Sequence, residues 1–392
     1  MNQSPVAVGL PGIPFNRPAL EGNELEYIRQ SVESGHTSSG GPFSKRAAAI
    51  LAAESGASEV LLTTSCTAAL ELSAMLLDLQ PGDTVIVPSF TFTSTALAFV
   101  RQGARIVFCD IEPETLGLDP RHVEALLDDT VRAVLPVHYA GIACEMAGLR
   151  SALEGRPDVA VIEDNAHGLF GRWNGQPLGS LGRMSTLSFH ETKNFVCGEG
   201  GALLLNDEGD VDRARVLYDK GTNRRAFFLG QVDKYTWKDT GSSFGLSDTL
   251  AAYLTAQLEQ RDVIQGKRRA VFDAYARALA PHVDEHGLRL PVVPAHCEPA
   301  YHMFYVLLRD RRTRDEVLRA MREDGVQATF HYVPLHSSDA GRRFSARATE
   351  CPVSDDVSGR LLRLPFSNDL TPDDIARVVA SLTGALSQVG TR

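Results

Sequence analysis

Short apolar segments alternate with amphipathic segments from about residue 58 to residue 205, and this alternation constrains the fold more than any other feature. Apolar segments rich in Val, Ile and Leu and bounded by polar residues are typical of buried strands. Strands that alternate with helices predict an α/β fold with a mostly parallel sheet covered on both faces. We expect strands at residues 60–64, 84–87, 105–108, 131–137 and 159–162, and helices at 68–77, 94–101, 119–127 and 144–154.

The second half of the chain predicts a smaller α/β unit. Residues 247–280 show a long helical pattern, which we interpret as a connector between domains. A strand at 301–308 and helices at 313–323 and 371–386 follow. A chain of 392 residues is long enough for two cores. We therefore expect a large domain over residues 1–250, including an N-terminal arm, and a small C-terminal domain over residues 251–392.

Composition excludes several classes of protein. The net charge is −10 and no long basic block is present, which argues against nucleic acid or an anionic membrane as partner. No window approaches 18 uninterrupted apolar residues, so no membrane span is expected. The six cysteines form no C-x-x-C pair, so we expect free thiols and no metal site. Residues 1–14 lack the pattern of a secretory signal, and we expect a cytoplasmic protein.

Polar residues follow several predicted strands at the point where each strand ends. Ser65, residues 90–93, His138 and Asp164 each come directly after or close behind one of them. Functional groups of parallel sheets gather beyond the carboxyl ends of the strands. We therefore expect these residues to lie at one edge of the sheet.

The pairing of Asp164 with Lys193 indicates the chemistry. The apolar residues 159–162 run into Glu163-Asp164-Asn-Ala-His167, and Lys193 follows about 30 residues later, between Ser188 and a glycine-rich turn. An acid at the end of a buried strand can keep a pyridine nitrogen protonated, a lysine can form a Schiff base, and hydroxyl groups can hold a phosphate. This combination indicates pyridoxal phosphate, and the alternative for Lys193 is a surface lysine in a loop.

Other motifs near these strand ends allow two interpretations each. The turn Ser65-Cys66-Thr67 can seat a phosphate at a helix N-terminus, or Ser65 can cap the helix without a ligand. The aromatic residues at 90 and 92 can belong to the core, or one of them can stack on a flat ring. His167 can contact a cofactor oxygen or a backbone group. The motifs of phosphate-loop enzymes, zinc proteases and serine hydrolases are absent from the sequence.

The ordered set of motifs resembles the sugar aminotransferases of the DegT/DnrJ/EryC1/StrS family, which adopt fold type I, the aspartate aminotransferase fold. The similarity extends over nearly the whole chain. The matching motifs are Ile13-Pro-Phe-Asn-Arg-Pro, Gly40-Gly-Pro, Ser65-Cys-Thr-Ala-Ala, Pro88-Ser-Phe-Thr-Phe, Pro136-Val-His-Tyr-Ala-Gly141, Glu163-Asp-Asn-Ala-His, Ser188-Phe-His-Glu-Thr-Lys-Asn, Gly198-Glu-Gly-Gly, His331-Tyr-Val-Pro-Leu-His336 and Leu364-Pro365.

The resemblance implies roles for individual residues. Lys193 would be the Schiff-base lysine, and Asp164 would bind the pyridine nitrogen. The resemblance also implies a homodimer with shared active sites, in which a residue of one subunit reaches the phosphate bound by the other. The cofactor-binding residues implied in this way are Ser65, Cys66, Thr67, Phe92, Asp164, His167, Ser188, Lys193 and Ser243.

One segment departs from the usual family pattern. Members commonly read Gly-Tyr-Asn-Tyr-Arg where this chain reads Gly241-Ser-Ser243-Phe-Gly245. With Asp233-Lys-Tyr-Thr-Trp237, this departure resembles the WecE-type subgroup. The subgroup transfers the amino group of L-glutamate to C4 of dTDP-4-keto-6-deoxyglucose, which gives dTDP-4-amino-4,6-dideoxygalactose. Four further residues are candidates to line the sugar or nucleotide site, and core packing is the alternative for each aromatic one: Tyr235, Trp237, His331 and Tyr332.

Three rival functions remain to be compared. The first is a family member directed to C3, to a UDP-sugar or to an inositol ketone. The second is a C3 dehydratase that uses the same cofactor, in which histidine replaces the lysine, so Lys193 argues against it. The third is a scaffold protein without turnover, which would be expected to lack Lys193 or Asp164.

Overall fold

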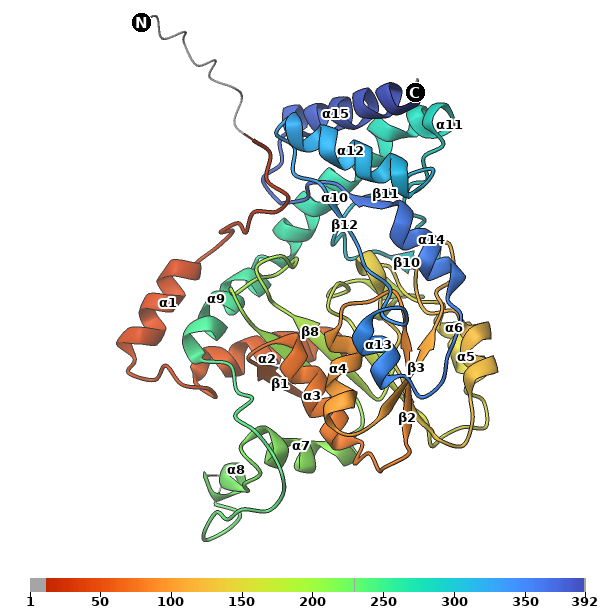
Figure 1. Ribbon diagram of the computed structural model, residues 1–392. Helices are drawn as coiled ribbons and strands as arrows, with labels where there is room; N and C mark the ends of the chain where they lie inside the picture. Colours follow the sequence, from red (N-terminus) through yellow and green to blue (C-terminus); the bar gives the residue numbers. More distant parts are fainter. Residues whose placement is uncertain (1–11, 229, 391–392) are drawn as a thin grey trace, which may run out of the picture.

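A computed structural model describes residues 12–228 and 230–390 of the chain (Figure 1). Most of the 1–14 segment considered above lies outside the described residues. The described part consists of a large sheet with helices around it and a cluster of later helices above it (Figure 1). Among the described residues, no helix combines the length and the hydropathy that a bilayer span requires.

The large sheet has seven strands, and all of them except β9 point in the same direction. The prediction of an α/β fold with a mostly parallel sheet is therefore confirmed. In spatial order the strands are β1 (Glu59–Thr63), β9 (Gly201–Leu205), β8 (Met184–Ser188), β5 (Ala160–Asp164), β4 (Val131–Val134), β2 (Thr84–Pro88) and β3 (Arg105–Cys109).

Helices cover both faces of this sheet because successive side chains of a strand point to opposite faces. Leu61 packs with α3 and α4, whereas its neighbours Val60 and Leu62 pack with α2 and α9. Farther along the sheet, α5 and α6 cover the same face as α2 and α9. These helices, with the others of the first two thirds of the chain, are α1 (Glu24–Glu33), α2 (Pro42–Ser55), α3 (Cys66–Leu76), α4 (Ser94–Arg101), α5 (Pro120–Leu126), α6 (Met146–Ala152), α7 (Val211–Tyr218), α8 (Arg224–Phe228) and α9 (Asp248–Glu259).

The sequence patterns placed these elements to within a few residues, and the differences have local causes. Strand β4 ends at Val134 instead of residue 137, because Pro136 has no N–H group to donate to a neighbouring strand. Asp119 caps α5, as expected, by accepting a hydrogen bond from the backbone N–H of Arg121. The expected strand at 301–308 is limited to β11 (Tyr305–Leu307), since Tyr301 has a positive φ of 51° that breaks the extended conformation.

The long helical pattern at 247–280 folds as two helices. Helix α9 ends before Gln260, and α10 (Arg261–Leu279) begins directly after it. The change of direction lets α9 pack against α1 and α2 while α10 packs against the last helix, α15. The division of the chain into domains at residue 250 stays a prediction.

Helices α10, α12 (Arg311–Glu323) and α15 (Pro372–Gly390) pack on one face of a second, smaller sheet in the upper part of Figure 1. Its spatial order is β11-β13-β12, so β13 is the central strand and pairs antiparallel with both neighbours. A third small sheet joins β6 (Arg172–Trp173) and β7 (Gln176–Pro177) to β10 (Cys297–Glu298). The remaining elements are α11 (Val283–His286), α12 (Arg311–Glu323), β12 (Thr329–Phe330), α13 (Asp339–Phe344), α14 (Pro352–Arg360), β13 (Leu361–Arg363) and α15 (Pro372–Gly390).

Gly201, the first residue of β9, joins two parts of the predicted phosphate site. It pairs with Thr63 of β1 on one side and with Ser188 of β8 on the other. A Cβ atom at this position would lie 2.5 Å from the backbone nitrogen of Cys66. Only a residue without a side chain lets the turn after β1 approach the start of β9 so closely.

We therefore predict that Gly201→Ala destabilises the protein by about 1–3 kcal/mol, the usual range for overpacking in a well-packed region. Urea unfolding of the cofactor-free protein measures this change in the free energy of unfolding. Gly266→Ala is the matched control, because Gly266 lies in α10 and no atom is within 4 Å of a Cβ placed there. The control should be neutral or stabilising by about 0.5–1 kcal/mol. Equal stability of Gly201→Ala and the wild type would contradict this account of the turn.

Candidate active site

A cavity of about 600 Å³ lies at the carboxyl ends of β1, β2, β5 and β8. Residues from the second half of the chain, including His302, His331, Tyr332 and Arg363, complete its wall. The predicted cofactor-binding residues that line this cavity are Ser65, Cys66, Thr67, Phe92, Asp164, His167, Ser188 and Lys193. The structure therefore brings together residues that are far apart in the sequence.

Lys193 lies in the turn that follows β8, and its side chain lines the cavity. Within the described part of the chain, the Lys193 amine makes no hydrogen bond and no ion pair. Burial lowers the pKa of this amine to about 8, and the nearby charge of Arg363 acts in the same direction. A lysine of lowered pKa is neutral for a substantial fraction of the time near pH 7–8, so its nitrogen can act as a nucleophile or as a base.

Asp164 is the last residue of β5, and its carboxylate is buried. One oxygen accepts a hydrogen bond from the Thr95 hydroxyl at 2.7 Å, and the other accepts one from the backbone N–H of Ala166 at 3.2 Å. Both donors are neutral, and among the described residues no cation forms an ion pair with Asp164. The carboxylate is therefore held in place while its charge stays available to a group in the cavity.

The start of α3 provides a place for an anion. Ser65 is the N-cap, and its hydroxyl oxygen accepts a hydrogen bond from the backbone N–H of Ala68 at 3.0 Å. The next two backbone N–H groups, of Cys66 and Thr67, donate to no group of the described residues. Free N–H groups at the positive end of a helix bind anions such as phosphate. Ser65 can therefore cap the helix while the same turn binds a phosphate, because the cap leaves the N–H groups of Cys66 and Thr67 free.

Three imidazole rings lie together in the wall of the cavity. The rings of His167 and His302 stack with centroids 4.2 Å apart, and His331 lies 6.4 Å from His167. Burial lowers the pKa of all three rings well below the usual value, and the Lys193 charge acts in the same direction, so they are neutral. The Nδ1 atom of His167 is buried without a hydrogen-bond partner among the described residues. This atom is free to bind a polar atom of a ligand.

His302 was not identified from the sequence. Its Nδ1 atom lies 2.6 Å from the Oδ1 atom of Asn194, and the Asn194 amide donates to the carbonyl of Ala300. Because Asn194 follows Lys193 directly, these contacts fix the turn that carries the lysine. The sequence signal for such a partner was the polar side chain of Asn194 directly after Lys193, because a polar side chain at this site needs a hydrogen-bond partner.

His138 has a structural role instead of lining the cavity. Its Nδ1 atom accepts a hydrogen bond from the backbone N–H of Cys144, so its Nε2 atom carries the proton and donates to Glu163 at 2.9 Å. Both side chains are fully buried. His138 does lie at the expected edge of the sheet, where its backbone N–H donates to the carbonyl of Asp164. Its ring does not line the cavity and binds the acid next to Asp164 instead.

Of the two aromatic residues that follow β2, one belongs to the core and the other lines the cavity. Phe90 is 1% exposed and packs against Tyr139 and Tyr332, so it belongs to the core. Phe92 is 57% exposed and lines the cavity, where its ring is free to stack on a ligand.

Three residues considered from the sequence lie away from the cavity of their own chain. Ser243 is exposed, and its backbone pairs with Asp219. Trp237 and Tyr235 are exposed to 83% and 53% on the segment that follows α8. A role for these residues at an active site requires a second subunit.

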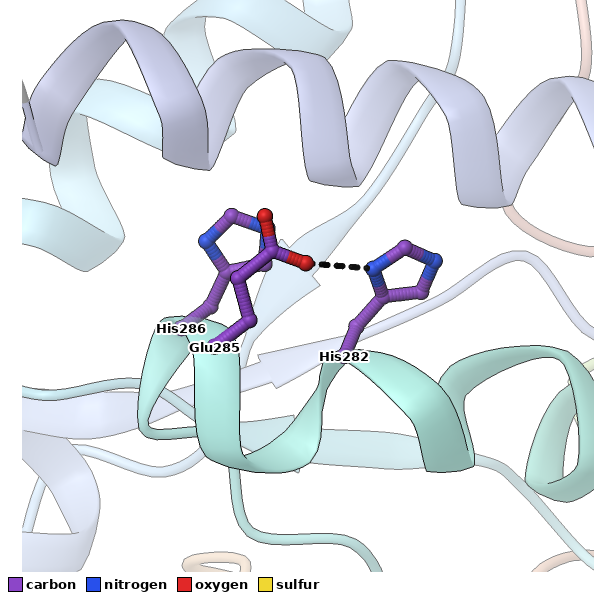
Figure 2. A group of neighbouring side chains, drawn as sticks. All are labelled: His282, Glu285 and His286. Atoms are coloured by element: carbon purple, nitrogen blue, oxygen red, sulfur yellow. Dashed lines mark hydrogen bonds and ion pairs between the residues drawn. The ribbon is translucent and has the colours of Figure 1, made fainter.

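A separate group of potential metal ligands lies on the short helix α11 and the turn before it (Figure 2). It consists of His282, Glu285 and His286, and the Nδ1 atom of His282 forms an ion pair with the Glu285 carboxylate at 3.3 Å. These residues do not line the cavity. The expectation that the protein has no metal site stays a prediction.

The free groups of the cavity fit pyridoxal phosphate. Counting only residues 12–228 and 230–390, the Lys193 amine and the His167 Nδ1 atom lack partners, and the Asp164 carboxylate lacks a cation. Within the same residues, two N–H groups at the start of α3 lack acceptors. The cofactor offers a carbon for the amine, a ring nitrogen for the carboxylate and a phosphate for the helix. A volume of about 600 Å³ also falls within the usual range for ligand pockets.

Comparison with known proteins agrees with this fit. Residues 18–383 match the DegT/DnrJ/EryC1/StrS aminotransferase family. The spore coat polysaccharide biosynthesis protein SpsC of Bacillus subtilis is 29% identical over 381 residues, which cover 94% of this chain and 96% of that protein.

Solved structures show the same fold. The aminotransferase TlmJ of Streptoalloteichus hindustanus superposes with a TM-score of 0.88 at 30% identity, covering 96% of this chain and all of that one. DesV of S. venezuelae, solved in complex with a ketimine intermediate, gives a TM-score of 0.86 at 29% identity, covering 96% of this chain and 99% of that one. The chain therefore belongs to the DegT/DnrJ/EryC1/StrS aminotransferase family and is a pyridoxal-phosphate-dependent aminotransferase of fold type I.

Proposed function

We propose that this enzyme transfers the amino group of L-glutamate to C4 of dTDP-4-keto-6-deoxyglucose, which gives dTDP-4-amino-4,6-dideoxygalactose. The observation that carries the amino transfer is the unpartnered Lys193 amine in the cavity that also holds the Asp164 carboxylate. The name of the Bacillus subtilis relative refers to polysaccharide biosynthesis, which supports a sugar substrate. The choice of C4 and of dTDP depends on the resemblance of residues 233–237 and 241–245 to the WecE-type subgroup.

Asp164 and Lys193 have complementary tasks in this proposal. Pyridoxal phosphate, when bound, supplies a ring that stabilises negative charge on the carbon next to the transferred nitrogen. The Asp164 carboxylate would accept a hydrogen bond from the ring N–H and keep that nitrogen positively charged. The Lys193 nitrogen holds the cofactor at rest, then takes the proton from the α-carbon of L-glutamate and later delivers a proton to the sugar carbon. A pKa of about 8 suits a group that both accepts and returns a proton near neutral pH.

Other residues that line the cavity would bind the cofactor and hold it in position. Ser188 and the N–H groups of Cys66 and Thr67 would hold the phosphate at the end of the sheet. Burial raises the pKa of the Cys66 thiol to about 12, so this thiol stays protonated and does not compete with Lys193 as a nucleophile. Phe92 would pack on one face of the cofactor ring, and His167 would contact its phenolic oxygen.

We propose a homodimer in which Ser243 of one subunit reaches the phosphate held by the other. Ser243 is exposed at a tightly built turn, because a Cβ atom at Gly241 would lie 2.2 Å from the backbone nitrogen of Gly221. A rigid, exposed turn with a hydroxyl group can serve a neighbouring subunit. A cytoplasmic location is also proposed, since the six cysteines are free, and subcellular fractionation tests it.

Asp164→Asn should keep the cofactor but lower the turnover rate by at least about 100-fold, because a neutral amide does not hold the ring nitrogen in its charged form. Steady-state turnover and the cofactor absorbance measure the two effects. Asp262→Asn is the control, because Asp262 is 91% exposed in the first turn of α10 and does not line the cavity. Unchanged turnover in Asp164→Asn would assign Asp164 a purely structural role.

Shared sites predict that two inactive variants restore activity when their subunits exchange. Lys193→Ala removes the amine, and Ser243→Asp places a negative charge beside the neighbour's phosphate. A mixed dimer has one site with both native residues, so random pairing of equal amounts should give about one quarter of the wild-type rate. The absence of rescue, with subunit exchange verified by mass spectrometry and with each variant inactive alone, would contradict shared sites.

The structure of the product tests which keto sugar the enzyme aminates and at which carbon. The enzyme is offered the 4-keto and the 3-keto forms of the dTDP-linked 6-deoxy sugar side by side, with L-glutamate as donor. We expect consumption of the 4-keto sugar and an axial amine at C4, read from a small coupling between the ring protons at C3 and C4. Preference for the 3-keto sugar, for a UDP-sugar or for an inositol ketone, or an equatorial C4 amine, would overturn this assignment.

A further inference from the structure

Three side chains with metal-binding groups converge at the turn that follows α10, outside the active-site cavity (Figure 2). His282, Glu285 and His286 are three and four residues apart, a spacing that places side chains on one face of a helix. Figure 2 shows all three on the same side of the turn. In the described part of the chain, no other three His, Cys, Asp or Glu side chains bring one ligand atom each within 4.8 Å of the others.

The backbone that carries these side chains is held at both ends. His282 is the last residue of a short 3-10 helix that continues α10, and α11 follows it directly. Gly287 ends α11 in the left-handed conformation, with a φ of 62°. The next residue, Leu288, donates its N–H to the carbonyl of Val283 at 3.0 Å, and its side chain is buried in the core around the small sheet. The three side chains therefore project from one fixed turn.

The distances between the nitrogen and oxygen atoms suit a single ion. The Nδ1 atom of His282 lies 3.3 Å from one oxygen of Glu285, and the Nε2 atom of His286 lies 3.8 Å from the other. Neighbouring ligands of a tetrahedral Zn²⁺ ion, each at 2.0–2.2 Å from the metal, lie about 3.3–3.5 Å apart. The Glu285 side chain is 62% exposed, so its carboxylate has room to rotate toward both nitrogens.

Glu285 has no permanent positive charge beside it among residues 12–228 and 230–390. Its carboxylate pairs there with His282 and His286 only, and an imidazole ring is charged only when it is protonated. A divalent ion supplies positive charge and accepts lone pairs from the carboxylate and from neutral imidazole nitrogens. The cluster therefore offers the donors that a metal ion needs.

The kinds of donor select the class of ion. Imidazole nitrogen suits zinc, nickel and copper, whereas magnesium and calcium prefer oxygen ligands. Two imidazoles, one carboxylate and a water molecule form a known set of ligands for zinc. The side chains of His282 and His286 are 32% and 11% exposed, so an ion can enter from solvent on the side of Glu285.

We propose that His282, Glu285 and His286 bind one divalent transition-metal ion, Zn²⁺ in the first place, with water as the fourth ligand. The expectation of no metal site was based on the cysteines, whereas these ligands are two histidines and a glutamate. The ion takes no part in the amino transfer, because the cluster does not line the cavity. It fixes the turn between α10 and the small sheet.

Calorimetric titration of the chelator-treated holoenzyme with Zn²⁺ tests the site, and the protein must carry no histidine tag. We expect one ion per chain. Replacement of any one ligand by glutamine should weaken binding at least about tenfold, the lower end of the loss caused by removing even an outer-shell partner. The control is His36→Gln, because His36 is exposed and forms no ion pair with a described residue. The control should keep the wild-type affinity, and Mg²⁺ should not bind.

Co²⁺ supplies a second readout that needs neither turnover nor a variant. A Co²⁺ ion held by two imidazoles and a carboxylate in four-coordinate geometry absorbs visible light much more strongly than the six-coordinate ion in water. We expect this absorbance to reach its limit at one equivalent of Co²⁺ and to vanish on addition of EDTA, while the cofactor absorbance remains. The same absorbance should be absent in His286→Gln.

Three results would overturn the proposal. One is the absence of saturable Zn²⁺ and Co²⁺ binding by the wild type. Another is equal affinity in the wild type and in all three ligand variants, which would place the ion elsewhere, such as at the imidazoles of the cavity. A loss in His282→Gln and His286→Gln without a loss in Glu285→Gln would exclude the carboxylate as a ligand. Wild-type melting temperature and turnover verify that the variants fold.

Discussion

The buried carboxylate of Glu163 holds together the part of the sheet on which the active site depends. Its two oxygens accept hydrogen bonds from His138 Nε2 and from the backbone N–H groups of Gly179, Leu181 and Gly182, at 2.7–2.9 Å. These bonds connect the end of β4, the end of β5 and the turn that leads into β8. Asp164 is the next residue, and Lys193 follows the end of β8, so one carboxylate fixes the positions of both. Of these two adjacent acids, Glu163 has a structural role and Asp164 faces the cavity.

Among the residues that the structure describes, three charged or chargeable groups of the cavity form no ion pair. Asp164 has neutral donors only, Lys193 has no hydrogen bond, and Arg363 has a neutral histidine beside it. Burial makes each of these arrangements unfavourable, and bound pyridoxal phosphate, with its ring nitrogen and its phosphate, offers charges of both signs. The site is therefore preorganised for a ligand that carries a ring nitrogen, a carbonyl carbon and a phosphate.

Much of the fold could be predicted from the sequence, because the alternation of buried strands and amphipathic helices is local information. Asp164 and Lys193 could be paired because each lies at the end of a strand in one parallel sheet, where strand ends converge. The function of His138 could not be predicted in this way, since the direction of its ring depends on Glu163 and on the backbone of Cys144.

The residues that sequence reasoning missed come from the second half of the chain. Arg363 and His302 reach the cavity because residues around β11 and β13 pack on the segments that follow β2 and β4. A signal for Arg363 was nevertheless present, because a charged residue stands inside the apolar segment Leu361-Leu-Arg-Leu-Pro-Phe366 and must find a polar site. The bend at Gln260 carried no such signal, as both flanking segments are good helix formers.

Covalent labelling tests the central claim, which is that the free amine of Lys193 holds the cofactor. The purified holoenzyme is reduced with borohydride, digested and mapped by mass spectrometry. The account predicts that the cofactor mass is found on the peptide that contains Lys193. Labelling of a different lysine, or no labelling although the protein contains bound cofactor, would contradict it.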